Sequence, residues 1–175
     1  MNMNFKSLYI QMFDENSSYE YKALLNENHI PDEFEYLNKQ KLQYNKKVYI
    51  LSGEYDKKVL FRTKTVRLLI GYCVVEDAKS KPENMHDWLD KLYDIPLDIL
   101  EEYPIVISDF VVSVDYRRMG YGKYLAEYIV YNVYSDKKIS LHAVEDGVFF
   151  WDKFGFEYVE GANSVMVLNG DGRYA

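Results

Sequence analysis

The stretch from Ile105 to Val130 constrains the fold of this chain more than any other. Residues 105–114 are rich in β-branched and aromatic side chains, which suit a largely buried strand. Residues 117–122 read Arg-Arg-Met-Gly-Tyr-Gly and break that pattern. Apolar residues then follow helical spacing, at Leu125, Ala126, Ile129, Val130 and Val133. The sequence therefore predicts a strand, a glycine-containing turn and a helix in succession.

Such a turn favours an anionic ligand. The first N–H groups of a helix have no acceptor inside that helix, and the helix dipole adds positive character there. Two arginines stand at the same place, Arg117 and Arg118. The chemistry that this arrangement indicates is capture of a phosphate or pyrophosphate.

The remaining pattern predicts a mixed α/β fold with a mostly antiparallel central sheet of six or seven strands. Strands are expected at residues 5–13, 48–51, 59–61, 66–75, 139–144, 156–159 and 165–168, with Gly53 weakening or ending one of them. Helices are expected at 19–28, from Pro31 onward and from Val148 to near Gly155. A right-handed crossover helix at Lys123–Tyr134 follows the fourth central strand. Gly71, inside a strand, indicates a bulge or a close backbone approach.

Residues 78–102 form a helical insertion between two central strands in this interpretation. Trp88, Leu89, Leu92 and Tyr93 have helical spacing, and Pro96 begins a further turn. Two roles stay open for the insertion: packing onto the sheet, or a wall or lid over a substrate site.

Length and charge set further bounds. With 175 residues and 48% hydrophobic content, residues 1–175 are expected to form a single domain. A net charge of −7 argues against general nucleic-acid binding, which needs a basic face, and favours a cationic substrate. No segment approaches membrane-spanning length and no signal region is present, so the expected location is the cytoplasm and no membrane partner is expected.

Metal chemistry is not expected. Cys73 is the single cysteine, which excludes an intrachain disulfide and a cysteine zinc cluster. His29, His86 and His142 are far apart and lack the spacing of metal ligands. Cys73 is interpreted as a small core residue rather than a covalent acyl carrier.

Two nucleotide-binding loops are excluded by spacing. A Walker loop needs glycines further upstream and a Ser or Thr after Gly122-Lys123, and neither is present. The dinucleotide fingerprint matches at Gly120 and Gly122, but Leu125 stands where a third small residue belongs.

The same residues resemble the Gcn5-related N-acetyltransferase family. Residues 117–122 match its acyl-CoA signature, (Gln/Arg)-x-x-Gly-x-(Gly/Ala), at every fixed position. Downstream, Phe150-Trp-Asp-Lys-Phe-Gly-Phe156 resembles the family's Phe-Tyr-x-Lys-x-Gly-Phe segment. The resemblance covers residues 105–159 and implies the acyl-CoA N-acyltransferase fold.

The resemblance implies that acetyl-CoA is the co-substrate. Backbone amides of residues 118–123 would bind its pyrophosphate, and the strand at 110–112 would splay from its neighbour and offer backbone groups to the pantetheine arm. The implied binding residues are Phe110, Val111, Val112, Arg117, Arg118, Met119, Gly120, Tyr121, Gly122 and Lys123.

The catalytic groups implied are less complete. Asp109 is the candidate base for the amine proton, with His142 as a second candidate. Trp151 occupies the position where many relatives carry a tyrosine that protonates the departing thiolate, and packing against the cofactor is the preferred interpretation of its indole. Tyr158 and Tyr121 are the substitute candidates for the acid.

The predicted function is acetyl transfer from acetyl-CoA to a primary amine by direct attack in a ternary complex. A small cationic molecule is the expected acceptor and partner, with a protein N-terminus or a lysine side chain as the other acceptors, and a homodimer is considered. The alternative is a non-catalytic acyl-CoA-binding sensor or interaction module. A third hypothesis keeps the fold and uses a larger acyl donor.

Overall fold

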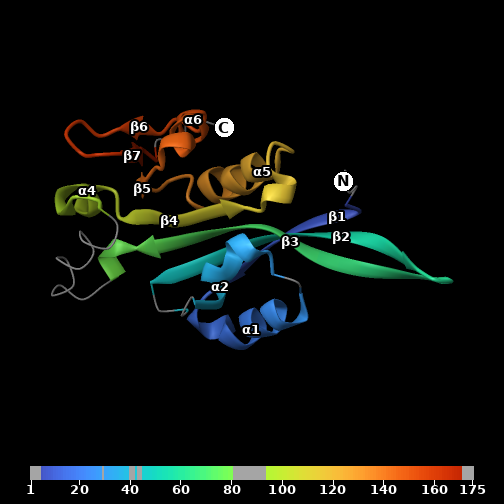
Figure 1. Ribbon diagram of the computed structural model, residues 1–175. Coiled ribbons are helices and arrows are strands. Elements are labelled where there is room, and N and C mark those ends of the chain that lie inside the picture. The colour runs from blue at the N-terminus through green and yellow to red at the C-terminus, as the bar shows by residue number, and fades with distance from the viewer. Residues whose placement is uncertain (1–4, 29, 40–41, 43–44, 81–93, 171–175) are drawn as a thin grey trace. The chain divides into compact units, whose positions relative to one another are not determined.

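The computed structural model describes residues 5–28, 30–39, 42, 45–80 and 94–170, and these form a mixed α/β protein (Figure 1). Seven strands make one sheet in the order β1-β2-β3-β4-β5-β7-β6. They are β1 (Ser7–Phe13), β2 (Lys46–Val59), β3 (Arg62–Asp77), β4 (Ile105–Val112), β5 (Ile139–His142), β6 (Glu157–Tyr158) and β7 (Val165–Leu168).

The pairing within the sheet confirms the predicted fold class. β1 with β2, β5 with β7, and β6 with β7 are antiparallel, whereas β4 and β5 are parallel. The parallel pair needs a crossover connection, and the helix that follows the fourth strand supplies it. This helix begins as α5 (Tyr121–Glu127) and continues as a π-helical segment, η6 (Tyr128–Val133).

The chain divides into two compact units. The first comprises residues 1–73 with 110–125, and the second comprises residues 74–109 with 126–175. β3, β4 and α5 contribute residues to both units.

In the first unit, two short helices cover strands near the N-terminus. α1 (Ser18–Glu27) follows the 3₁₀ turn η1 (Glu15–Ser17), which Asp14 caps by accepting the N–H of Asn16 at 2.9 Å. The helix predicted at 19–28 is present as α1, which buries Tyr21, Leu24 and Leu25. After the turn η2 (Asp32–Phe34) comes α2 (Glu35–Lys39). Phe34 is fully buried and meets Tyr72 of β3 edge-on, with ring centroids 5.2 Å apart.

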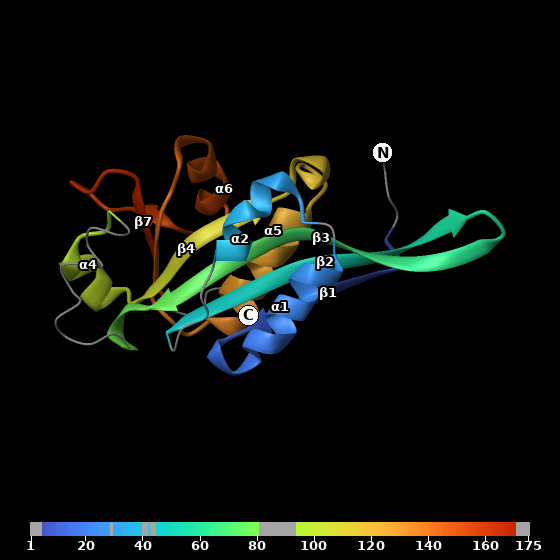
Figure 2. The ribbon, with the colours of Figure 1, turned by 60° about the horizontal axis from the view of Figure 1, so that its bottom comes forward.

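The hairpin of β2 and β3 is longer than the sequence pattern predicted. The strand predicted at 48–51 is present within β2, which runs on to Val59. The separate strand predicted at 59–61 is wrong, because a turn occupies residues 60–61. Gly53 does not end the strand; a Cβ atom there would come within 2.5 Å of the Phe5 ring, so glycine makes room for that ring. The hairpin extends past the end of β1 in both views (Figures 1 and 2).

The second unit builds its core from the ends of several elements. Its elements after η3 (Ala78–Ser80) are α4 (Leu97–Glu102), the first part of β4, η6, β5, the turn η7 (Glu145–Gly147), α6 (Val148–Asp152), β6 and β7. One apolar cluster joins Ala78, Ile95, Leu100, Val106 and Val165. The described part of the insertion therefore packs into the core of the second unit. This agrees with the first of its two predicted roles, packing, rather than with a wall or lid over a substrate site.

The other residues of the insertion pattern, Trp88, Leu89, Leu92 and Tyr93, lie outside the described residues. Across the described ranges, no helix combines the length and the apolar character needed to cross a membrane.

Candidate functional site

The predicted anion-binding turn is built where β4 passes into α5. β4 ends at Val112, and the N–H of Ser113 donates to the carbonyl of Ile70 on β3 at 2.9 Å. A 3₁₀ turn, η5 (Val114–Tyr116), follows, and residues 117–120 form an exposed turn. The helix starts with the N–H of Tyr124 donating to the Gly120 carbonyl at 2.9 Å. The strand, turn and helix predicted for this stretch are all present.

The backbone of this turn leaves its inner face open. Arg118 has a φ of 64° and Gly120 a φ of 88°, both in the left-handed region. A Cβ atom added at Gly120 would meet nothing within 4 Å, so there is open space beside the start of α5. The N–H groups of Tyr121 and Gly122 are first-turn donors, for which a helix offers no internal acceptor. These features fit an anionic ligand.

The two arginines of the turn differ in what they contact. The Nε of Arg117 donates to the carbonyl of Val112 at 3.0 Å, which folds this side chain back along the end of β4. Arg118 is exposed, and within the described residues it has no hydrogen bond or ion pair. Arg118 is therefore the guanidinium that is available to a ligand, whereas Arg117 also braces the turn.

Glu33 of η2 holds the beginning of the turn from a distant part of the chain. Its Oε1 accepts the N–H of Val114 at 2.6 Å. The pKa of Glu33 lies below its usual value because the carboxylate accepts its own backbone N–H and that of Val114, then the Ser113 hydroxyl, with a further contribution from the charge of Arg117. Sequence reasoning missed this residue, since a contact across 81 positions leaves no local signal.

Aromatic rings pack beneath the same turn. The rings of Tyr116 and Tyr121 lie 5.6 Å and 5.8 Å from that of Phe5, and 6.1 Å from each other. Burial first, then the charge of Asp115, raises the pKa of the Tyr116 hydroxyl. Tyr121, one candidate acid, is thus half-buried in a packing cluster that orders the start of α5.

The strand that leads to the turn carries the other predicted cofactor contacts. Phe110, Val111 and Val112 are half-buried on β4. β4 pairs with β5 only over residues 105–107, although β4 itself continues to Val112. On the β3 side, a Cβ atom at Gly71 would lie 2.8 Å from the Val111 carbonyl oxygen. Gly71 therefore marks a close backbone approach, one of the two meanings predicted for it.

The candidate catalytic residues lie in the second unit. Asp109 is half-buried on β4, directly before Phe110. Tyr158 is on β6 opposite Met166 of β7, and its side chain is 56% exposed. His142, the second candidate base, is exposed at the end of β5.

A buried carboxylate that contacts Ser108, the residue before Asp109, was not predicted from the sequence. Glu76 of β3 is 4% exposed, and its Oε1 accepts the hydroxyl of Ser108 at 3.0 Å. A glutamate at the end of an apolar strand is ordinarily exposed to solvent, so the sequence pattern did not indicate that Glu76 is buried.

Trp151 belongs to an aromatic cluster of the second unit. It is 6% exposed, and its ring lies 5.0 Å from Phe150, 5.3 Å from Phe156 and 6.0 Å from Phe154. Its indole is therefore held by protein packing. Cys73 is fully buried, in accord with the core role predicted for it.

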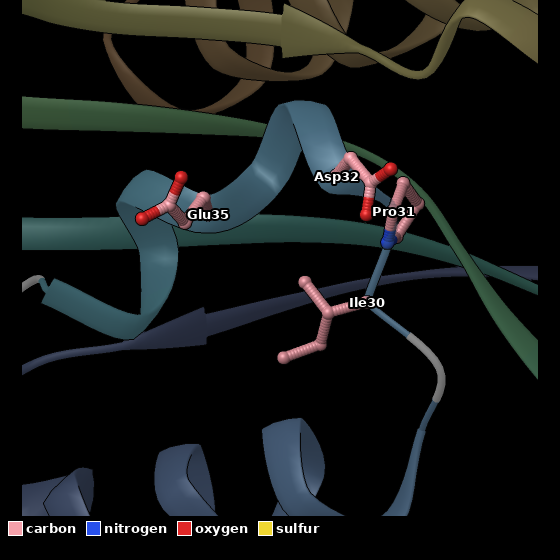
Figure 3. A pocket seen from close by; sticks show the side chains of 4 residues that line it. All are labelled: Ile30, Pro31, Asp32 and Glu35. Carbon is pink, nitrogen blue, oxygen red and sulfur yellow. The ribbon is translucent and has the colours of Figure 1, made fainter.

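A pocket lies in the first unit, at the segment that leads from α1 into α2 (Figure 3). It has a volume of about 300 Å³ and is lined by Ile30, Pro31, Asp32 and Glu35. None of the predicted site residues lines it. In the described part of the chain, no group of three or more His, Cys, Asp or Glu side chains is placed to hold a metal ion.

Comparison with known proteins defines the fold. Neither a family model nor a curated protein matches the sequence. Among solved structures, AtaTR bound with acetyl-CoA has a TM-score of 0.53 at 15% identity, covering 92% of each chain. A mutant AtaT toxin bound to the C-terminus of the antitoxin AtaR has a TM-score of 0.52 at 14% identity, also covering 92% of each chain. The KacTA–DNA complex has a TM-score of 0.51 at 15% identity, covering 93% of this chain and 92% of the other.

This chain thus has the Gcn5-related N-acetyltransferase fold, as its motifs predicted. More narrowly, it is similar in fold to the toxin proteins AtaT and KacT.

These structures overturn the partner prediction. A small-molecule amine as partner, with no nucleic acid, was expected from the acidic net charge. Proteins of the same fold are instead solved with a protein antitoxin and in a complex with DNA. The prediction is wrong because net charge averages over the whole chain and does not report which molecules a local surface meets.

Proposed function

We propose that this protein is an acetyl-CoA-dependent acetyltransferase that transfers the acetyl group to an amine. The observation that carries the proposal is the turn at residues 117–122, open at Gly120 and followed directly by α5. Its support comes from the match to the acyl-CoA signature and from the fold shared with AtaTR, which is solved with acetyl-CoA. The proposal treats residues 1–175 as one acetyltransferase domain.

In this proposal each part of the turn has a task. The backbone N–H groups from Arg118 to Lys123 bind the pyrophosphate, and Arg118 adds a charge-assisted contact. Met119 borders the ligand at the exposed side of the turn, where it is 43% exposed. The backbone groups of residues 110–112 orient the pantetheine arm. When bound, acetyl-CoA supplies an activated acyl group and a thiolate leaving group.

Two side chains are assigned to proton movement. Asp109 accepts the proton of the attacking amine, directly or through water, because a neutral amine is the nucleophile. Tyr158 donates a proton to the departing sulfur, since the buried Trp151 is held in a packing cluster and its indole is a poor acid. We assign the amine to a larger molecule, in line with the protein and nucleic-acid complexes of this fold.

Calorimetry with two ligands tests the binding step. Arg118→Gly removes the guanidinium at a position whose φ of 64° suits glycine, so the fold is expected to keep its stability. We expect this variant to bind acetyl-CoA about 5- to 30-fold more weakly, the loss of one exposed charge-assisted contact. Binding of acetyl-pantetheine, which lacks the pyrophosphate, should be unchanged.

Equal weakening for both ligands, or no effect of Arg118→Gly on either, contradicts the pyrophosphate role. Arg62→Gln, which removes an exposed arginine outside the turn, is the matched control. Failure of the unaltered protein to bind acetyl-CoA at micromolar concentration would overturn the proposed function.

The alternative function, acyl-CoA binding without catalysis, is favoured by one observation. Trp151 stands at the usual tyrosine position and is buried. Thiol release measured across a broad panel of primary amines, peptides and proteins included, separates the two functions. Release that Asp109→Asn abolishes supports the enzyme, whereas tight acetyl-CoA binding without release on any acceptor supports the binding module.

A further inference from the structure

The end of the β2–β3 hairpin is a basic and apolar projection of the first unit. Every residue from 56 to 65, here called the hairpin tip, is exposed. Leu60 is 93% exposed and Phe61 is fully exposed, while Val59 is 46% exposed. The hairpin tip also contains Lys57, Lys58, Arg62 and Lys64, and its one acidic residue is Asp56. Figure 2 shows the hairpin reaching well beyond β1.

Folding alone does not account for these residues. The two-residue turn of such a hairpin favours Asn or Gly, because it needs positive φ. Leu60 adopts a φ of 52° there, which is unfavourable for a branched apolar side chain. In addition, the large apolar side chains of Leu60 and Phe61 are exposed to water. Residues that cost stability at an exposed turn point to a binding role.

The register places three cations on one face. The turn at 60–61 sets Val59 opposite Arg62 and hence Lys57 opposite Lys64. The hydrogen bond from Thr65 Oγ1 to Asp56 Oδ1, at 3.1 Å, agrees with that register. Since alternate residues share a face, Lys57, Arg62 and Lys64 lie together around Val59. The like charges of Lys57 and Lys64, directly opposite each other, are unfavourable in a sheet and add a third cost of this sequence.

The neighbouring carboxylates do not neutralise these cations. Asp56 forms its ion pair with Lys6, and Glu54 accepts from Tyr9 and lies 3.6 Å from Arg67. Among the described residues, no ion pair reaches Lys57, Arg62 or Lys64. The face therefore keeps a local charge of +3 in a chain whose net charge is −7.

We infer that the hairpin tip binds single-stranded nucleic acid. Three cations on one face suit a row of phosphates, and the open ring of Phe61 suits stacking against an unpaired base. A lipid bilayer is a poorer occupant, because the cations lie mainly on one face and two exposed apolar side chains give little anchoring. An acidic peptide would satisfy the charges but has no flat base for Phe61 to stack on. The inference does not depend on acetyl transfer.

Fluorescence anisotropy with a labelled 12-nucleotide single-stranded RNA tests this binding. We expect the logarithm of affinity to fall with the logarithm of salt concentration with a slope of about −2, from three phosphate contacts at roughly 0.7 each. The triple variant Lys57→Gln, Arg62→Gln, Lys64→Gln should reduce the slope to near zero. Phe61→Ala should weaken binding at least about fivefold through lost stacking. A blunt RNA duplex of the same sequence should bind less tightly.

A second triple variant matches the charge change elsewhere. Lys22→Gln, Lys47→Gln and Lys153→Gln remove three exposed lysines outside the hairpin tip and should leave affinity within about twofold. Equal losses in the two triple variants would overturn the inference, because binding would then follow net charge. No binding to the RNA or its DNA counterpart at 50 mM salt would also overturn it. So would binding to phosphatidylserine vesicles that depends on Phe61 without any nucleic-acid binding.

Discussion

Gly71→Ala is expected to destabilise the first unit by separating two strands. The added Cβ atom would lie 2.8 Å from the Val111 carbonyl oxygen and 3.3 Å from Val112 Cγ2. Ordinary contact begins at 3.4 Å, so β3 and β4 must move apart locally by about 0.6 Å, the difference between 3.4 and 2.8 Å. Overpacking of this kind costs about 1–3 kcal/mol. Alanine also restricts the unfolded chain, which stabilises the folded state by about 0.4–1 kcal/mol. The free energy of unfolding should therefore fall by about 1–2 kcal/mol in total.

Urea and thermal unfolding measure this loss. For a chain of this length, we expect the melting temperature to fall by roughly 2–8 °C. Gly147→Ala is the matched control: its φ is −81°, and the added Cβ would meet Val144 Cγ2 at an ordinary 3.4 Å, so this variant should be unchanged or slightly stabilised. Because Val111 and Val112 are assigned to the pantetheine arm, Gly71→Ala should also weaken acetyl-CoA binding. If Gly71→Ala is as stable as Gly147→Ala, the close approach of β3 and β4 has no energetic consequence and the reasoning fails.

Two further predictions concern the helices of the first unit. Glu33→Gln should lower stability by at most about 1 kcal/mol at neutral pH, because its contact with the Val114 N–H is open to solvent. The folded-state pKa of Glu33 lies below its usual 4.5, so its contribution is complete above that value and is lost as pH falls through the folded pKa. The stability gap between the two proteins should therefore be constant from pH 8 to 6 and close in acid, and a gap that widens in acid contradicts the assignment. Tyr21→Phe should cost about 1–2 kcal/mol in urea unfolding, because the buried hydroxyl donates to the Leu37 carbonyl at 2.7 Å. Tyr19→Phe, at an 82% exposed position, should change stability by less than about 0.5 kcal/mol, and equal effects of the two would refute the buried contact.

The sequence was informative where the structure is local. Between Ile105 and Val130, the residue pattern of each segment by itself indicates a strand, a turn or a helix. The order of these three elements was predicted correctly. The same holds for the buried face of α1, whose apolar residues recur at helical spacing. A helix of period 3.6 and a strand of period 2 leave signals within ten residues of themselves, so single-sequence reasoning can detect them.

Long-range contacts left no comparable signal. Gly53 looked like the end of a strand, yet it is a site where the Phe5 ring covers the backbone. The turn before α5 is held by Glu33, and Ser108 is held by the buried Glu76. Each of these features depends on a partner that the fold brings from elsewhere in the chain, and no pattern around the residue reveals it.

Net charge gave the most misleading prediction, and the local charge of the hairpin tip has the opposite sign. A value of −7 summed over 175 residues suggested that nucleic acid would be repelled. Charges separated by more than a Debye length of about 8 Å are largely screened from each other at physiological salt, so distant carboxylates hardly affect a ligand at a projecting hairpin. What such a ligand meets is Lys57, Arg62 and Lys64, with Asp56 already paired to Lys6. In an acidic protein, local charge on the elements that project from the fold is therefore a better guide to an anion-binding surface than the net charge of the chain.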